Sequence, residues 1–182
     1  MRLSSIDHLQ VRVTYGDVVS TPIPGGDGIS GFVSSIETVG SPTVDTKSPT
    51  ANNSTDCNGF SSPSNAHASD NVYATGSGDI ANFSTMYRTF GFTIPASKTI
   101  TKVELLLESK CNSTGVTHVI DIGTPGSPDT CGNFNSVGSG SVFDPLAEAV
   151  RAFDVTAAKV WVPADFDNAN LRVLVTALHG QV

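Results

Sequence analysis

The sequence has few charged residues and lacks any cluster of positive ones. Charged residues make up 15% of the 182, and the formal net charge at pH 7 is -7. Proteins that bind nucleic acid through its phosphates need grouped Lys and Arg side chains to displace counterions. The composition therefore predicts that nucleic acid is not a partner.

The chain also lacks a long hydrophobic run. No apolar stretch approaches the roughly 18 residues that a membrane-spanning helix needs, and no hydrophobic segment follows Met1 and Arg2 as a signal peptide would require. We therefore expect synthesis in a cytoplasm and no membrane partner.

Cysteine is scarce, and its spacing matches no metal site. An odd number of cysteines, Cys57, Cys111 and Cys131, cannot all pair within one chain. Cys111 and Cys131 flank a possible hairpin and would bridge in an oxidising medium, whereas reduced, partly buried thiols are the simpler interpretation. No metal or cofactor is expected from this pattern.

Turn-forming residues, by contrast, are abundant. The chain has 17 glycines and 10 prolines, together with many Ser, Thr and Asn residues. This composition is typical of all-β proteins with many turns, and the length fits one core with extensions. We therefore predict an all-β fold, an antiparallel β-sandwich.

The clearest strand pattern lies at the N-terminus, in "SSIDHLQVRVTYGD", residues 4–17. Polar residues alternate there with Leu9, Val11, Val13 and Tyr15, the period of a strand with one buried face. Some 50 residues of turn-forming sequence follow before a comparable pattern returns, so the partner of this strand is not evident from its neighbours.

Residues 17–68 are rich in turn formers, and a structureless loop of this length inside a compact domain would be unusual. We predict an arm that lies over another surface, such as a neighbouring subunit. Within it, "GISGFVSSIETVG" predicts a docking segment, a short helix or a strand, through Ile29, Phe32, Val33 and Ile36.

Strand patterns separated by Gly or Pro turns follow from residue 69, at the spacing of a sandwich. One helix is expected over 144–153, "DPLAEAVRAF", with Asp144 as N-cap and Pro145 at the first helical position. The inward residues predicted for the strands are Phe90, Phe92, Ile94, Val103, Leu105, Leu107, Val116, His118, Ile120, Ile122, Leu171, Val173, Val175 and Ala177.

Three segments carry a resemblance to a known family: "SDNVYATGSG" (69–78), "FGFTIPASKTITKVELLLE" (90–108) and "WVPADFDNANLRVLVTA" (161–177). Together they resemble a β-sandwich, jelly-roll-like domain of bacteriophage virion structural proteins, over roughly residues 65–178. The resemblance implies one further closing strand after the late strand. "IDHLQVRVTYG" (6–16) is similar to that closing strand and stands at the N-terminus instead.

The resemblance therefore implies two parts: an N-terminal arm, residues 1–65, with donor strand 6–16 and an extended linker, and a β-sandwich domain, residues 66–182. The donor strand would complete a sandwich through Leu9, Val11, Val13 and Tyr15. The linker is long enough to reach its own domain or that of another subunit. Exchange between subunits is favoured, and completion within the chain is the alternative.

The function that the resemblance implies is structural. We expect a non-enzymatic virion protein, made in the host cytoplasm, that decorates or cements a phage capsid. It would bind the major capsid protein or other virion proteins and form homo-oligomers by strand exchange. Two alternatives remain open: a carbohydrate-binding or host-adhesion module of a tail or fibre, and a self-assembling donor-strand surface filament.

Candidate small-molecule sites are weaker. His8, His67, His118 and His179 are scattered, and His118 fits a buried, hydrogen-bonded histidine better than a catalytic one. Oxygen-bearing side chains in "PADFDNAN" could suit calcium but equally suit a turn before a strand. An aromatic platform for sugars would use Trp161, Tyr73 and Tyr87, although aromatics in sandwiches are more often core.

Overall fold

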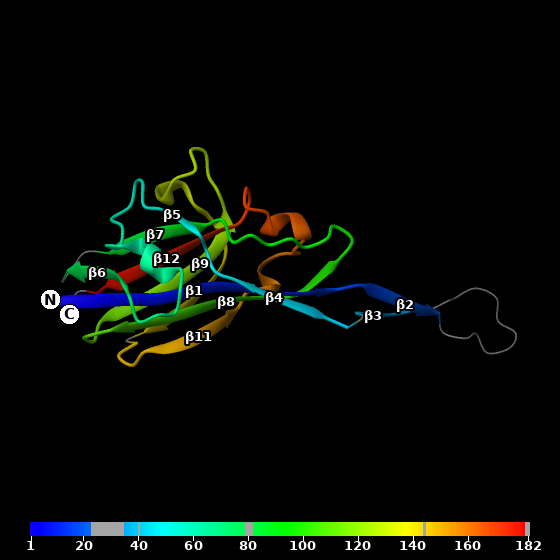
Figure 1. The fold of residues 1–182 in the computed structure, drawn as a ribbon, viewed down its shortest axis with the longest axis horizontal. Coiled ribbons are helices and arrows are strands. Elements are labelled where there is room, and N and C mark those ends of the chain that lie inside the picture. Colours follow the sequence, from blue (N-terminus) through cyan, green and yellow to red (C-terminus); the bar gives the residue numbers. More distant parts are fainter. Residues whose placement is uncertain (23–34, 40, 79–81, 144, 181–182) are drawn as a thin grey trace, which may run out of the picture.

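A computed structural model of the chain describes residues 1–22, 35–39, 41–78, 82–143 and 145–180, and for 18–22 and 35–39 it describes the backbone only. The predicted all-β fold is confirmed: two antiparallel five-stranded sheets pack on one hydrophobic core (Figure 1). The only helices in the described residues are short 3-10 turns, η1 (Pro63–Ala66), η2 (Cys131–Asn133), η3 (Thr156–Ala158) and η4 (Pro163–Phe166).

The first sheet has the order β11-β8-β1-β4, and β6 also pairs with β1. The second sheet has the order β10-β9-β12-β7-β5. The strands of the first sheet are β1 (Arg2–Gly16), β4 (Thr43–Lys47), β6 (Ala74–Gly78), β8 (Thr99–Cys111) and β11 (Ala149–Asp154). Those of the second are β5 (Ala51–Asn53), β7 (Phe83–Arg88), β9 (Val116–Thr124), β10 (Asn135–Phe143) and β12 (Arg172–His179).

β1 is a central strand of the first sheet. It pairs with β8 along most of its length, and its other edge is shared by β4, opposite Val11 to Tyr15, and β6, opposite Arg2 to Ile6. The late strand β12 lies in the second sheet, so β1 completes the sandwich without lying beside β12.

The alternating patterns place their inward residues correctly. Val103, Leu105 and Leu107 of β8 face the inner residues of β9 and β12, and all are fully buried. Phe90 and Phe92 are also buried, but outside a strand, because β7 ends at Arg88. Positive φ angles at Thr89 (62°) and Gly91 (72°) interrupt the extended backbone there, which for Gly91 needs no side-chain strain.

The helix predicted over 144–153 is wrong. Residues 149–154 form β11, which pairs with β8 from Ala149 opposite Ser109 to Asp154 opposite Glu104. Pairing with the open edge of β8 satisfies backbone groups, and the inner Phe153 packs against Gly140 of β10. Leu146 and Val150, which a helix would place on one apolar face, are 54% and 55% exposed.

Residues 17–65 differ from the extended linker that was predicted. β2 (Val18–Pro22) and β3 (Ser35–Val39) pair as a hairpin. β4 is a strand of the first sheet, β5 is a strand of the second, and Phe60 is buried in the core. From here on we use the word arm for the β2–β3 hairpin alone, and not for the whole of residues 1–65. It projects from the body beyond β1 and β4, at the end opposite the chain's N-terminus (Figure 1).

The disulfide is also not the one that the sequence raised as a possibility. Cys57 pairs with Cys131, 74 residues apart in sequence. Cys111 lies at the end of β8, where its buried thiol donates a hydrogen bond to the Ser113 carbonyl at 3.1 Å.

Candidate functional site

The residues predicted for the donor strand form one continuous inner seam of β1, which we call the β1 seam: Leu9, Val11, Val13 and Tyr15. The first three are fully buried, and Tyr15 packs partly buried against the same core. Opposite them in β8 stand Leu107, Leu105 and Val103. Burying each of the three aliphatic side chains contributes about 1.5 to 3 kcal/mol, so this seam is a major source of cohesion between β1 and the body.

An ion pair joins the outer face of β1 to the outer face of β8. Arg12 Nε donates to Glu104 Oε2 at 2.9 Å, and Lys102 Nζ lies 2.9 Å from Glu104 Oε1. The hydrogen bond from Arg12 is the main reason that the pKa of the Glu104 carboxyl lies below its usual value, and Lys102 adds to it. Glu104 is mostly buried beneath these two cations, although it lies on the outer, polar face of β8.

Asp7 breaks the regular pattern of β1. The register with β8 shifts between Ile6 and His8, which makes Asp7 the extra residue of a β-bulge. Its carboxyl is 1% exposed, accepts hydrogen bonds from the backbone of Asp70 and Asn71, and keeps Oδ1 without a partner in the described structure. Burial, with the nearby negative charges of Glu108 and Glu148, raises the pKa of Asp7.

A loop of the same chain, residues 67–73, covers this bulge. Ser69 Oγ donates to Glu108 Oε2 at 2.8 Å, and Tyr73 Oη donates to Glu148 Oε2 at 3.0 Å. Lys110 Nζ donates to Tyr73 Oη at 2.6 Å and to Glu148 Oε2 at 3.2 Å. The bulge and its cover therefore tie β1 to β8 and to the segment before β11.

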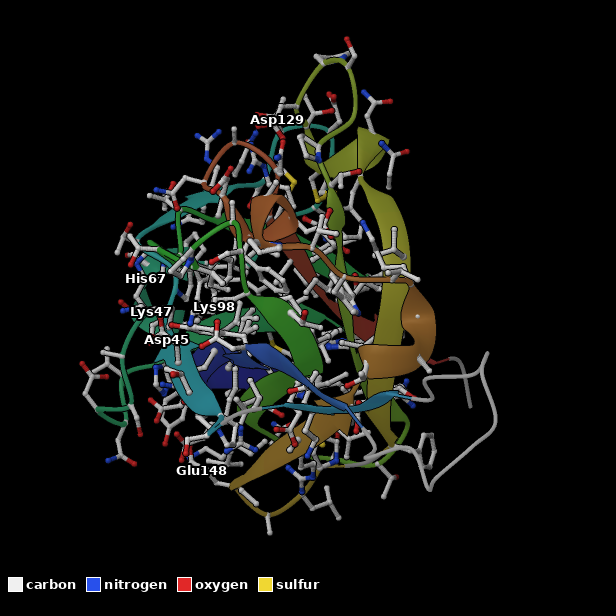
Figure 2. All side chains as sticks on the ribbon, turned by 90° about the vertical axis from the view of Figure 1, so that its right-hand side faces the viewer. Asp45, Lys47, His67, Lys98, Asp129 and Glu148 are labelled. Atoms are coloured by element: carbon white, nitrogen blue, oxygen red, sulfur yellow. A yellow bond between two sulfur atoms is a disulfide. The ribbon has the colours of Figure 1, made fainter. Side chains whose placement is uncertain are left out.

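The arm begins at an ion pair on the opposite end of β1. Lys98 Nζ lies 2.8 Å from both carboxylate oxygens of Asp17, the residue between β1 and β2. The labelled Lys98, Asp45 and Lys47 lie near one another at the end of the sandwich that faces the viewer in Figure 2. Within the described residues no further strand joins β2 or β3.

The predicted arm-docking residues are mostly beyond what the structure describes. Ile29, Phe32 and Val33 lie outside the described residues. Ile36 lies in β3, where its backbone stands opposite Thr21 of β2. Their docking role stays a prediction.

The candidate sugar platform is not formed. Trp161 is 8% exposed, packs on Phe166 and donates its indole N–H to the Val155 carbonyl at 3.2 Å. Tyr87 is fully buried, and only Tyr73 reaches the surface, in the loop that covers Asp7.

The oxygen-bearing side chains of "PADFDNAN" are used for local structure. Asp165 accepts from Lys159 Nζ at 2.7 Å and from the Val162 N–H at 2.9 Å. Asn168 Oδ1 accepts from the Gly91 N–H at 2.9 Å, and Asn170 Nδ2 donates to the Ala164 carbonyl at 2.8 Å. Within the described ranges, no group of three or more His, Cys, Asp or Glu side chains is arranged to hold a metal ion.

The structure does not bring the four histidines together as one site. His8 contacts Ser48 at 2.8 Å, His67 contacts Asn52 at 3.4 Å, and the two histidines form an isolated β-bridge with each other. His118 is buried as predicted, but both of its ring nitrogens lack a partner in the described structure. Burial lowers the pKa of His118 to about 4, and the positive charges of His179 and Arg151 add to this effect.

Two features escaped the sequence reasoning. The bulge at Asp7 has a signal, because the buried Ile6 and Leu9 stand three residues apart where strict alternation allows two or four. The buried Arg172, which donates to Asp129 Oδ1 and Oδ2 at 3.1 and 2.7 Å, has none, because its partner lies 43 residues away in a loop.

Comparison with known proteins adds no relative. No family model matches the chain, and neither a curated protein nor a solved structure does. None of the described helices is long and apolar enough to span a bilayer.

Proposed function

We propose that this chain is a non-enzymatic structural protein of a bacteriophage virion, a decoration or cement protein that stabilises a capsid. The observation that carries the proposal is the arm: a two-stranded ribbon that leaves the sandwich and has no third strand in the described residues. An isolated two-stranded hairpin is marginally stable in water, so a surface outside the body is needed to support it. The resemblance of the sandwich segments to phage virion domains supplies the identity of that surface, the shell.

The connectivity refines the proposed strand exchange. β1 and β4 are antiparallel neighbours joined through the arm, so an exchange would move residues 1–47 as one unit. The hinge would then be residues 48–50, "SPT", between β4 and β5. The β1 seam would be the same in both arrangements, with β8 supplied by a neighbour, so exchange would link subunits without creating a new hydrophobic surface.

The capsid role is tested with particles of the phage that encodes the chain. A variant in which residues 18–39 are replaced by a short Gly-containing turn should keep the sandwich's melting temperature and lose its place on purified shells. Quantitative mass spectrometry of gradient-purified particles measures occupancy. Full occupancy without the arm, or absence of the wild-type protein from particles, would contradict the proposal.

The exchange is tested with cysteines placed across β1 and β8. Gln10 and Leu106 are paired in register on the outer face, so Q10C/L106C can form a disulfide between the two strands. Exchange predicts a covalent oligomer in non-reducing electrophoresis of assembled protein, whereas closure within one chain gives a cross-linked monomer. The single variants Q10C and L106C are the matched controls.

A further inference from the structure

Each sheet leaves one long edge open on the same side of the sandwich. In the described structure β11 ends the first sheet and β10 ends the second, and neither has a second strand partner. An open edge presents unpaired backbone N–H and C=O groups to any other chain, so natural proteins usually protect it with charge, proline, bulges or short length. The two edges differ in this protection.

β11 is protected. It spans six residues and carries Arg151, whose guanidinium turns back on the chain's own carbonyls, with Nη1 3.2 Å from the Ala149 oxygen and Nη2 3.3 Å from the Ala147 oxygen. Asp154 adds a negative charge at its far end. A second strand would have to displace Arg151 and bury charge, which is costly.

β10 is much less protected. Its nine residues, "NSVGSGSVF", include no ionisable side chain and no proline. A register shift between Ser136 and Gly138 interrupts the pairing near the start of β10, and residues 138–143 then pair regularly with β9. Its inner face is filled, because a Cβ at Gly138 or Gly140 would meet Ala158 or Phe153. The edge is therefore held in extended form, ready to accept a strand.

The absence of charge on β10 makes this edge a place where a second copy of the chain can approach. Each chain has a net charge of -7, so two copies repel one another over most of their surfaces. Two β10 strands placed side by side bring no charge opposite another charge, and they would cover part of Phe143, which is 70% exposed. Antiparallel pairing of identical strands also closes with twofold symmetry and leaves no further open copy of the same edge.

We propose that β10 is a dimerisation edge: two copies pair β10 with β10 in antiparallel fashion and join their five-stranded second sheets into one continuous sheet. This contact is separate from the arm and from β1, and it does not depend on the virion role. Its consequence is a two-sided building block in which the arms remain available for a further surface.

The test uses charge at the centre of β10 in the full-length protein. Ser139 is exposed and stands opposite Asp121 of β9, so we expect S139K to keep the wild-type melting temperature and S139E, which faces that carboxylate, to fold with a slightly lower one. In a self-paired edge each variant places like charges close together, and we expect the dimer to weaken by at least about tenfold in sedimentation equilibrium. An equimolar mixture of the two variants should recover the dimer through opposite charges. A152K, on the outer face of the protected β11, is the matched control and should leave the dimer unchanged.

Several results would overturn the proposal. One is a wild-type protein that stays monomeric up to submillimolar concentration. Another is a dimer that S139K and S139E do not weaken, which would place the contact elsewhere, for example in exchanged β1 strands. Each of these results leaves the capsid proposal standing, because that proposal is tested separately by the occupancy of particles.

Discussion

Two polar groups buried beside β12, Arg172 at its start and His118 of β9 towards its end, are held in opposite ways. At its start, Arg172 is buried but fully engaged: it donates to both oxygens of Asp129 and to the carbonyls of Asn168 and Leu171. Towards its end, beside Ala177, His118 of β9 is equally buried and both ring nitrogens lack a partner in the described structure. The charge of Arg172 is stabilised by its partners, whereas the buried ring of His118 is tolerated only in its neutral form.

The surroundings of the two ends explain the difference. The Arg172 end lies under the loop that carries Asp129, and the Cys57–Cys131 disulfide anchors that loop. Asp129 projects on the outer side of the second sheet, on the opposite side of the molecule from Glu148 (Figure 2). The His118 end faces the interior between the sheets, where Arg151 and His179 are its charged or titratable neighbours. A covered outer face can thus hold an ion pair, whereas the interior has no carboxylate to offer.

The largest effect is expected from breaking the disulfide. C57S/C131S releases a link between residues 74 apart, and the loop-closure entropy of that span corresponds to about 4 kcal/mol of unfolding free energy. Urea unfolding without reductant measures the loss, and wild-type protein in reductant should approach the variant. C57S/C131S unfolding at the wild-type midpoint would show that the disulfide does not anchor the Arg172 end. C111S is the control for a thiol outside the bond.

The second effect is expected from removing the partner of Arg172. D129A leaves the buried guanidinium without its carboxylate, and we expect a loss of about 3 kcal/mol. D167A, in an exposed turn nearby, removes the same charge and should change stability by less than about 0.5 kcal/mol. Because Arg172 holds the pKa of Asp129 below its usual value, the stabilisation is present above the unfolded pKa near 3.8 and disappears as pH falls below it. If D129A and D167A lowered the unfolding free energy equally, the ion pair with Asp129 would not be what stabilises the buried Arg172.

Much of the fold at both ends of β12 was accessible from sequence. Alternation placed Val173, Val175 and Ala177 inward, and it placed His118 among the buried residues of its strand. It could not show that His118 lacks a partner, because partners across a sandwich come from other strands at no fixed sequence distance.

Other features depended on pairing that the sequence does not encode locally. The segment 149–154 satisfies a helical pattern, but the open edge of β8 accepts it as a strand, so tertiary pairing overrides the local preference. The choice of Cys57 as the partner of Cys131 depends on two loops meeting over the second sheet. The seam residues of β1 were identified by pattern, whereas exchange between subunits remains a prediction.

The third prediction concerns how the unfolding free energy changes with pH through His118, near the end of β12. The folded-state pKa of His118 is lowered from 6.5 to about 4, so its contribution is fully present above pH 6.5 and is lost as pH falls towards 4. The shift corresponds to about 3 kcal/mol. H118L should remove this acid-dependent loss while keeping stability near wild type at pH 7, as measured by urea unfolding at pH 7 and pH 4.5. H67Q removes a partly buried histidine whose pKa is also lowered by burial, and it should remove only a smaller part of the acid-dependent loss. An H118L protein as acid-sensitive as wild type would exclude His118 as the cause.

The smallest effect compares two buried hydroxyls, one unpartnered and one engaged. Ser109 Oγ on the inner face of β8 has no partner in the described structure, and the Ser109 carbonyl accepts from Arg151, the residue whose charge also reaches His118. Thr85 Oγ1 is equally buried but bonds Ser54 Oγ at 2.9 Å and accepts from the Phe60 N–H at 3.2 Å.

Both hydroxyls can be removed with little change of shape, by S109A and T85V. Losing an engaged hydroxyl leaves partners unsatisfied and should cost about 1 to 2 kcal/mol, whereas losing an unpartnered one should be neutral or slightly stabilising. Urea unfolding of both variants at pH 7 gives the comparison directly. If S109A cost as much as T85V, the Ser109 hydroxyl would have a partner in solution, such as a buried water, and the interior near His118 would be better satisfied than the contacts within the chain indicate.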